Sequence, residues 1–352
     1  MRKDQINLAA LSRAYSDKMG RKITFTGIQK IGSGYHSDGF QLTSSDGRSF
    51  FVKYLRSHDL GFEFPERKVM SLMVSHGMGR RARSDTASLG AIIIDGDDGL
   101  VLPEITDTMK IYHLQEFAGT GTSYSTVLKK NLKKKEVDDT DRRQLSAIAD
   151  RLVNIHSVKH PSKNKDQRTA VYNDGLRNML THPELSIMVL SEFPADHPIL
   201  NLKGQQEMIS LMYGNIKAWM GRSDRLTALH GDFWGANIFF REDESIFIID
   251  FSRIPWGDPA IDVGWFIAEY LWYYHLTGNP YFKELAETWL DIYGEKSGDK
   301  EIRKAIPLVL GWIGIVQIYP RWFPDIDVAV GRTFIGHIKA ILKHKELIWK
   351  NF

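Results

Sequence analysis

The chain has 352 residues, 43% hydrophobic and 25% charged, which are the proportions of a folded globular protein and exclude disordered, collagen-like and coiled-coil classes. Forty-six basic side chains against 43 acidic ones leave a formal net charge of +3, so charge gives no reason to expect a nucleic-acid partner. The absence of cysteine excludes disulfides, iron–sulfur clusters, thiolate zinc sites and cysteine nucleophiles, and it fits a cytoplasmic protein.

The N-terminal twenty residues carry scattered charges and lack the apolar core of a signal peptide. No later segment reaches 18 uncharged apolar residues. The aromatic stretch 265–274 is interrupted by Glu269, which favours a core helix over a membrane span. We therefore expect neither export nor a membrane partner.

The first third of the chain is predicted to be rich in strands. Short β-branched or aromatic segments at 23–28, 39–42 and 49–55 are separated by glycine, serine and aspartate, and the turn at 44–47 predicts a hairpin. A helix is predicted from Pro65 to about Ser75, because proline is tolerated in a first helical turn.

Two further strands are predicted at 91–94 and 100–102, and from Tyr124 onward the pattern becomes helical, most clearly from Asp141 to His156. These features predict an α+β fold with two lobes. An antiparallel sheet with one main helix forms the N-terminal lobe, residues 1–117. A larger, mostly helical lobe comprises residues 118–352.

A lysine-rich run lies at 129–135. Such a run could contact nucleic acid or lipid, but acidic residues follow it at once and no aromatic side chains alternate with it. We interpret it as a solvated surface and expect no nucleic-acid partner.

The strongest chemical signal is a set of oxygen-bearing side chains. Asp232 and Asn237 lie five residues apart in a loop segment, and Asp250 follows the apolar run 246–249. Phosphoryl transfer needs one carboxylate to accept the proton of an acceptor hydroxyl, and hard oxygen ligands to hold magnesium against nucleotide phosphates. Asp232 suits the first role, and Asn237 and Asp250 suit the second.

Three ordered motifs resemble the aminoglycoside phosphotransferase and choline kinase family, relatives of the protein kinases that phosphorylate small molecules. They are H-G-D-x-x-x-x-N at 230–237, I-I-D ending at Asp250, and G-D-P-A-I-D at 257–262. The resemblance implies a two-lobed, protein-kinase-like fold with the active site between the lobes, and a reaction that uses ATP and Mg2+. It implies that the N-terminal lobe, residues 1–117, binds the nucleotide and that the C-terminal lobe, residues 118–352, carries the catalytic and acceptor-binding residues. It implies that Asp232 is the catalytic base and that Asn237 and Asp250 bind magnesium.

The same resemblance implies supporting roles for three residues. His230 would hold the catalytic loop rather than act as a base, and Asp258 and Asp262 would brace the loop from behind.

A kinase-like fold also requires a phosphate-covering loop, a lysine on a strand and a glutamate on the next helix. The glycine-rich segment Gly32, Ser33 and Gly34 is the candidate loop, although its spacing departs from G-x-G-x-x-G. Alternation along the strand 49–55 places Phe51, Lys53 and Leu55 on one face.

By resemblance, Lys53 contacts the α- and β-phosphates and Phe51 lies over the adenine. Glu66 is the first candidate for an ion pair with Lys53, and Glu63 is the second. The connection between the lobes is predicted at 113–119, where the carbonyl of Gln115 and the amide of Phe117 would meet the adenine edge.

Other functions remain as alternatives. A metal hydrolase is disfavoured because no further histidine cluster accompanies His230. An atypical protein kinase is disfavoured because Gly231 replaces the arginine of H-R-D, and residues 251–256 leave no room for a long activation loop. A non-catalytic nucleotide-binding scaffold is the third alternative.

The acceptor is open among amino alcohols, sugars and aminoglycoside-like compounds, as are the choice of ATP or GTP and the oligomeric state. Aromatic residues from 256 onward could form a cation–π box, but aromatic residues at helical spacing more often fill a core.

Overall fold

The computed structural model describes residues 6–34, 37–56, 65–81, 88–95, 98–99 and 110–349. The chain divides into two compact units, Met1–Gly119 and Thr120–Phe352. The division follows Gly119, whereas the sequence analysis expects it to follow Phe117. The two units are described separately.

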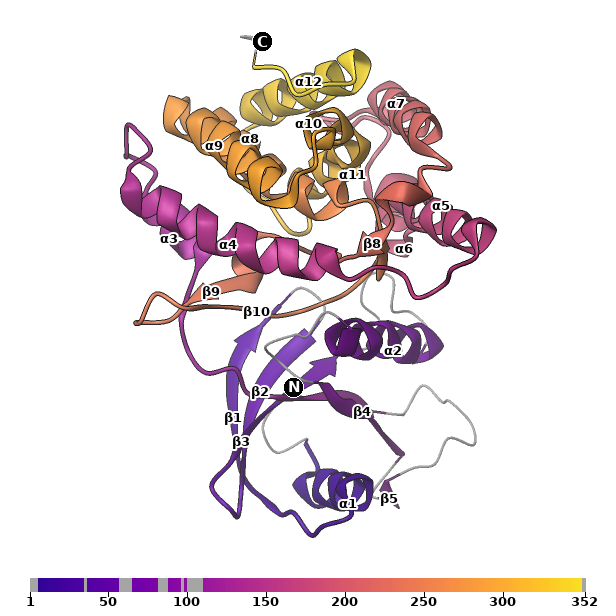
Figure 1. The fold of residues 1–352 in the computed structure, drawn as a ribbon, viewed down its shortest axis with the longest axis vertical. Coiled ribbons are helices and arrows are strands. Elements are labelled where there is room, and N and C mark those ends of the chain that lie inside the picture. Colours follow the sequence, from indigo (N-terminus) through magenta and orange to yellow (C-terminus); the bar gives the residue numbers. More distant parts are fainter. Residues whose placement is uncertain are drawn as a thin grey trace. The chain divides into compact units, whose positions relative to one another are not determined.

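The described residues of unit 1 form an antiparallel sheet and two helices (Figure 1). The strand order is β1-β2-β3-β6-β4-β5. Its elements are α1 (Leu8–Met19), β1 (Phe25–Ser33), β2 (Ser37–Ser44), β3 (Ser49–Leu55), α2 (Pro65–Arg81), β4 (Ser88–Asp95), β5 (Asp98–Gly99) and β6 (Lys110–Glu116).

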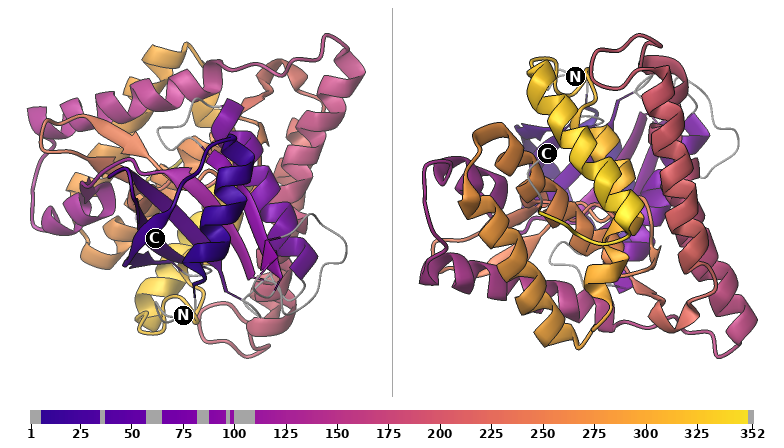
Figure 2. Two further views of the ribbon diagram at one scale, coloured as in Figure 1. Left: turned by 90° about the horizontal axis from the view of Figure 1, so that it is seen from below. Right: turned by 90° about the horizontal axis from the view of Figure 1, so that it is seen from above.

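Alternation along β3 sends its side chains to two different clusters. Phe50 and Val52 join the buried cluster beneath α1, which also contains Leu11 and Tyr15. Leu55 packs instead with Leu72 of α2. Because neighbouring strand residues face opposite sides, Phe51 and Lys53 share the side of Leu55, as the sequence predicts. The left view of Figure 2 shows α1 lying across the strands.

Helix α1 is the main feature of unit 1 that the sequence analysis missed. Asn7 caps its first turn by accepting a hydrogen bond from the backbone N of Ala10 at 3.0 Å, and Gly20 ends it with φ 63°. Both are standard helix-end signals.

Other boundaries also differ from the predictions. The helix that begins at Pro65 continues to Arg81, and the strand predicted at 91–94 is the longer β4. The strand predicted at 100–102 lies outside the described residues. The predicted hairpin turn at 44–47 is confirmed, with Gly47 donating its amide to the carbonyl of Ser44 at 2.9 Å.

Unit 2 is mostly helical and contains two small antiparallel sheets, β10-β9-β7 and β11-β8. Its strands are β7 (Thr122–Ser123), β8 (Thr227–Ala228), β9 (Ile238–Phe240), β10 (Ile246–Ile248) and β11 (Trp256–Gly257). Its α-helices are α3 (Tyr124–Lys130), α4 (Asp139–Ser157), α5 (Lys165–Thr181), α6 (Pro183–Ile187), α7 (Leu202–Trp219), α8 (Ala260–Thr277), α9 (Pro280–Ser297), α10 (Ile302–Ala305), α11 (Pro307–Gln317) and α12 (Val328–His344). A π-helical turn, η2 (Met188–Glu192), follows α6, and short 3-10 turns η3 (Ser223–Arg225) and η4 (Gly235–Asn237) precede β8 and β9.

Helices α8 and α11 form the centre of unit 2. Every residue of α11 is buried, as are residues 260–271 and Tyr273 of α8. Helix α11 contacts α7, α8 and α12, and the right view of Figure 2 shows α12, in yellow, on the outside of this unit. The aromatic stretch 265–274 therefore belongs to a core helix, as predicted. The amphipathic helix predicted from Asp141 to His156 is α4, which begins with a capping box at Asp138.

The lysine-rich run 129–135 ends α3 and enters the following turn. Lys134 lies 2.7 Å from a carboxylate oxygen of Asp138 and 2.6 Å from one of Asp141, so this lysine ties the turn to the start of α4. Within the described ranges, no helix combines the length and apolarity needed to cross a membrane.

Candidate active site

His230 organises the loop that carries the strongest motif. Its Nε2 lies 2.8 Å from the carbonyl of Ile249, and its Nδ1 accepts the backbone N–H of Asp232 at 3.2 Å. A neutral imidazole has one donor and one acceptor, so the proton belongs on Nε2. His230 is fully buried. It therefore holds the loop beside the end of β10, in agreement with the implied structural role.

Gly231 is required by the path of the backbone. Its φ is 82°, and a Cβ built at this position would lie 1.9 Å from the carbonyl oxygen of Ser252. Non-glycine residues rarely adopt this φ, and no side chain fits at such a distance. The close contact brings the loop against the segment that follows Asp250.

Asp262 supports the loop directly. Its two oxygens accept the backbone N–H groups of His230, at 2.7 Å, and Gly231, at 2.8 Å. Its Oδ2 also lies 3.0 Å from Nε2 of His156. Asp262 is fully buried, so these bonds replace the water that its carboxylate would otherwise bind.

Asp258 acts one step further away. Among the described residues it binds the Arg225 guanidinium at 2.7 and 3.0 Å, the Tyr172 hydroxyl at 2.8 Å and the backbone N of Ala260 at 2.9 Å. Asp258 therefore supports the loop indirectly: it secures the start of α8, from which Asp262 reaches the loop.

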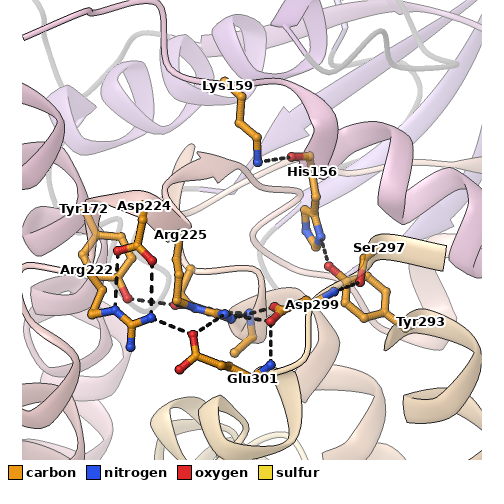
Figure 3. A network of polar contacts seen from close by, with 12 residues as sticks. His156, Lys159, Tyr172, Arg222, Asp224, Arg225, Tyr293, Ser297, Asp299 and Glu301 are labelled. Atoms are coloured by element: carbon orange, nitrogen blue, oxygen red, sulfur yellow. Dashed lines mark hydrogen bonds and ion pairs between the residues drawn. The ribbon is translucent and has the colours of Figure 1, made fainter. Parts of the chain in front are cut away.

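Arg225 connects this region to the end of α9. Its guanidinium also forms two 2.8 Å bonds with Asp299, which follows α9 (Figure 3). Arg222 lies beside it and binds Glu301 at 2.6 Å. Paired forks of this kind bind carboxylates with defined geometry. The network therefore fixes β8, which leads into the loop 230–237.

Asp232 and Asn237 are brought together by the 3-10 turn η4. The Asn237 amide nitrogen donates to the backbone carbonyl of Asp232 at 2.9 Å and to its Oδ2 at 3.2 Å. Because the nitrogen faces two acceptors, the amide oxygen points elsewhere. Asp232 and Asn237 are both buried residues. This arrangement leaves the Asn237 amide oxygen available to a cation.

Asp250 ends the apolar strand in a left-handed conformation, with φ 62°. Such backbone is uncommon for residues other than glycine and is often found at functional sites. In the part of the chain that is described, no three His, Cys, Asp or Glu side chains form a metal cluster. Asn237 and Asp250 offer two hard oxygen ligands, which fits magnesium because this ion keeps several waters and substrate phosphates in its shell.

Arg253 is a site residue that the sequence analysis missed. Its Nη1 forms an ion pair with Oδ1 of Asp232. Its Nε and Nη2 both donate to Oε2 of Glu184 at 3.2 Å. Burial raises the pKa of the Asp232 carboxyl, Arg253 opposes that rise, and the nearby charge of Asp250 adds to it. The position three residues after Asp250 is the only sequence signal for Arg253.

Glu269 supports the other end of the loop. It accepts the Gly235 backbone N–H at 2.9 Å and the hydroxyl of Ser125 at 2.7 Å. The side chain is 5% exposed, and burial raises the pKa of its carboxyl despite both bonds. The sequence analysis noted Glu269 only as a charge that interrupts an aromatic stretch.

In unit 1, Phe51 and Lys53 lie on β3 next to Gly39 of β2, which pairs with Lys53. A Cβ on Gly39 would lie 2.8 Å from the Phe51 ring, so glycine lets the ring lie over β2. The Phe51 ring is therefore held against the hairpin that contains the glycine-rich segment.

That hairpin is longer than predicted. Gly32 and Ser33 belong to β1, and Gly34 donates its amide to the Ser37 carbonyl at 2.8 Å. Asp38 is buried; burial would raise its pKa, but hydrogen bonds from Lys30 and Ser33 lower it to about 2.

Arg56 contacts this hairpin from the end of β3. Its Nη2 donates to the Gly34 carbonyl at 2.6 Å, and its Nη1 lies 3.4 Å from Asp38. No sequence pattern predicts this contact, because Arg56 and Gly34 are 22 residues apart.

The remaining candidates of unit 1 are placed only by their backbone. Gln115 lies in β6, opposite Phe51, and Phe117 follows the end of this strand. Glu66 lies in the first turn of α2, with a side chain outside the described part of the structure, and Glu63 lies outside the described residues altogether.

The C-terminal aromatic residues mostly fill the core, which the sequence analysis favoured. Trp312 and Tyr270 are fully buried, and Trp265 is 4% exposed. The Arg253 guanidinium carbon lies 5.6 Å from the centre of the Trp265 ring. This ring therefore already has a cation over one face.

The sheet of unit 1, the helical unit 2 and the H-G-D-x-x-x-x-N loop with its strand-ending aspartate together define a small-molecule phosphotransferase with a kinase-like fold. A family profile gives the more specific assignment. The profile of the phosphotransferase enzyme family, APH, matches residues 27–304. The chain belongs to this family.

Solved structures agree on the fold. A thermostable mutant of aminoglycoside phosphotransferase APH(4)-Ia, in complex with ADP and hygromycin B, superposes with a TM-score of 0.52 at 13% identity, covering 95% of this chain and 98% of that chain. Plasmodium vivax ethanolamine kinase gives 0.54 at 12% identity, covering 97% and 87%. A candidate fructosamine-3-kinase from Haemophilus somnus gives 0.51 at 10%, covering 94% and 97%. No match was found among curated proteins.

Proposed function

We propose that this phosphotransferase moves the γ-phosphoryl group of ATP to a hydroxyl of a small molecule, with Asp232 as the base and magnesium as the cofactor. The observation that carries the proposal is the contact of the Asn237 amide nitrogen with Asp232, which joins the candidate base to a candidate magnesium ligand. The structures of APH(4)-Ia with ADP and with AMP-PNP support a nucleotide donor.

In the proposed reaction, the acceptor oxygen forms a bond with the γ-phosphorus while the bond to the ADP oxygen breaks. Asp232 accepts the hydroxyl proton, and ADP leaves with the bonding electrons. Bound magnesium would neutralise charge on the phosphates, held by the Asn237 amide oxygen and the Asp250 carboxylate. Use of ATP is the reason for proposing a cytoplasmic location.

Unit 1 would bind the nucleotide. Lys53 is proposed to contact the α- and β-phosphates and Phe51 to lie against the adenine, with Glu66 as the partner of Lys53. Backbone groups of Gln115 and Phe117 would meet the adenine edge. The hairpin at Gly32, Ser33 and Gly34 would lie near the phosphates, because its glycines allow close approach of the backbone.

The protein-kinase alternative is weakened by the short connection after Asp250. Strand β11 begins at Trp256 and α8 at Ala260. A peptide-binding activation loop has no room in this segment. The solved neighbours include an aminoglycoside phosphotransferase bound to hygromycin B, an ethanolamine kinase and a candidate fructosamine-3-kinase, which supports a search among amino alcohols, amino sugars and aminoglycosides.

The test is ADP release from Mg·ATP with a panel of acceptors: ethanolamine, choline, fructoselysine, methylthioribose, homoserine and hygromycin B. Asp232→Asn should lower turnover by about 10²- to 10⁴-fold, the usual contribution of a general base. ATP binding, measured by calorimetry, should change little. Asp243→Asn is the matched control, because Asp243 is an exposed aspartate on the turn between β9 and β10.

Turnover in Asp232→Asn close to that of the control would refute the assignment of the base. Tight ATP binding without transfer to any acceptor would favour the non-catalytic scaffold.

A further inference from the structure

Glu184 is distant from the catalytic loop in the sequence but close to it in space. It lies at the start of α6, 69 residues before Arg253, and accepts hydrogen bonds from Nε and Nη2 of that residue, each at 3.2 Å. Glu184 is 6% exposed, so little water competes for its carboxylate. The third guanidinium nitrogen, Nη1, faces Asp232. One guanidinium therefore bridges two buried carboxylates.

The shape of the guanidinium makes this bridge directional. Arginine presents its N–H groups in a rigid planar fork, so fixing one edge fixes the direction of the remaining nitrogen. Glu184 holds the Nε and Nη2 edge, and the Trp265 ring lies 5.6 Å from the guanidinium carbon. The direction of Nη1 is consequently set by contacts outside the catalytic loop.

The Asp232 carboxylate is held on both oxygens as a result. Oδ1 pairs with Arg253, and Oδ2 accepts the Asn237 amide at 3.2 Å. Arg253 itself has φ 64°, an uncommon backbone conformation for a residue with a side chain. Without Glu184, the guanidinium could turn about its side-chain torsions, and Oδ1 would lose a fixed partner.

A purely structural role is the competing explanation. Buried ion pairs often contribute little net stability, because the cost of removing the charges from water offsets their attraction. The two explanations differ in what they predict for turnover. A structural pair changes the stability of the fold, whereas a positioning pair changes the rate of the chemical step.

We propose that Glu184 is a positioning residue that acts through Arg253 to hold the Asp232 carboxylate in the orientation needed to accept the proton of the acceptor hydroxyl. This inference rests on the proposed function of Asp232. Glu184 lies outside the H-G-D-x-x-x-x-N motif, and the proposal gives it a role in the reaction.

The test is a double-mutant cycle with Glu184→Gln and Arg253→Gln, measured as ADP release with the best acceptor of the panel above. Glu184→Gln keeps the size of the side chain and removes its charge. We expect kcat to fall about 10- to 100-fold, the scale of a small misplacement of a catalytic group. The KM for ATP should change little. Glu207→Gln is the control, since Glu207 pairs with Lys339 and Lys343 on α12.

The cycle distinguishes action through Arg253 from an independent effect. In the Arg253→Gln background, Glu184→Gln should change kcat by less than about twofold, because the residue through which it acts is gone. Effects that multiply in the double variant would overturn the proposal, as would a kcat for Glu184→Gln equal to that of the control.

Two further outcomes have separate meanings. If Glu184→Gln does not fold, Glu184→Asp, which keeps the charge but shortens the reach, takes its place in the same cycle. A wild-type protein that transfers phosphate to none of the acceptors would overturn the proposed function and this inference with it. An active wild type with an unchanged Glu184 variant would overturn this inference alone.

Discussion

Replacing Gly231 by alanine tests whether the catalytic loop depends on its close approach to Ser252. The φ of 82° would cost an alanine about 1–2 kcal/mol. The new Cβ would also lie 1.9 Å from the Ser252 carbonyl oxygen, a backbone atom that cannot move alone. Such overpacking costs about 1–3 kcal/mol more.

Gly221 provides a matched control. Its φ is 86°, but a Cβ on this residue would have no atom within 4 Å. Gly221→Ala should therefore show the backbone cost alone, and the difference between the two variants should be the cost of the contact.

For a unit of this size, about 1 kcal/mol corresponds to about 2–4 °C in melting temperature. Gly231→Ala should therefore melt about 2–12 °C below Gly221→Ala in differential scanning fluorimetry, and it should lose turnover while the control keeps it. Equal melting temperatures with equal turnover would refute the argument that the loop is pressed against Ser252.

Three other substitutions test the proposed magnesium site, the pH dependence of stability in the C-terminal helices, and the Arg225 network. Asp250→Ala should abolish the magnesium dependence of ATP binding in calorimetry, because it removes a carboxylate ligand. Burial and the neighbouring His337 lower the pKa of the His275 imidazole to about 4 in the folded chain, below its value of about 6.5 in the unfolded chain. The free energy of unfolding should therefore fall as the pH drops from about 6.5 to about 4, by up to about 1.4 kcal/mol per pH unit. In urea unfolding, the free energy of unfolding of His275→Gln should depend less on pH than that of wild type. Arg225→Lys should destabilise unit 2 by about 1–3 kcal/mol, because lysine cannot serve two carboxylates as a fork.

Each of these has an outcome that contradicts it. Magnesium-dependent affinity unchanged in Asp250→Ala would remove Asp250 from the metal site. The pH dependence of stability should be compared between His275→Gln and wild type at pH 7 and pH 5. Identical slopes would show that His275 is protonated as readily in the folded as in the unfolded chain. A melting temperature of Arg225→Lys equal to that of wild type would show that the Arg225 network is not needed for stability.

The sequence alone predicts the candidate site residues that lie within one continuous motif. His230, Asp232 and Asn237 lie within eight residues, so local backbone chemistry brings them together. The alternation that places Phe51 and Lys53 on one side of β3 is equally local. In contrast, Glu184 reaches Arg253 only because α6 lies next to the segment after Asp250, and no periodicity of the chain predicts that contact.

The errors of prediction also have local causes. Helix α1 was missed although Asn7 and Gly20 are ordinary cap residues, because the charged residues Arg13, Asp17 and Lys18 interrupt its apolar positions. The glycine-rich segment was assigned to a loop because Gly32 and Gly34 suggest one. In the structure, pairing with β2 extends the strand to Ser33, so cross-strand hydrogen bonds prevail over the weak strand propensity of glycine.

Helix α8 explains how a loop without regular structure keeps its geometry. Asp262 and Glu269 are seven residues apart, close to two helical turns, so they lie on one face of α8. Asp262 accepts the amides of His230 and Gly231, and Glu269 accepts that of Gly235. The spacing of two carboxylates along a buried helix thus sets the spacing of two parts of the loop. Because Asp262 and Glu269 bind the loop through its backbone N–H groups, they leave the side chains of Asp232 and Asn237 available for chemistry.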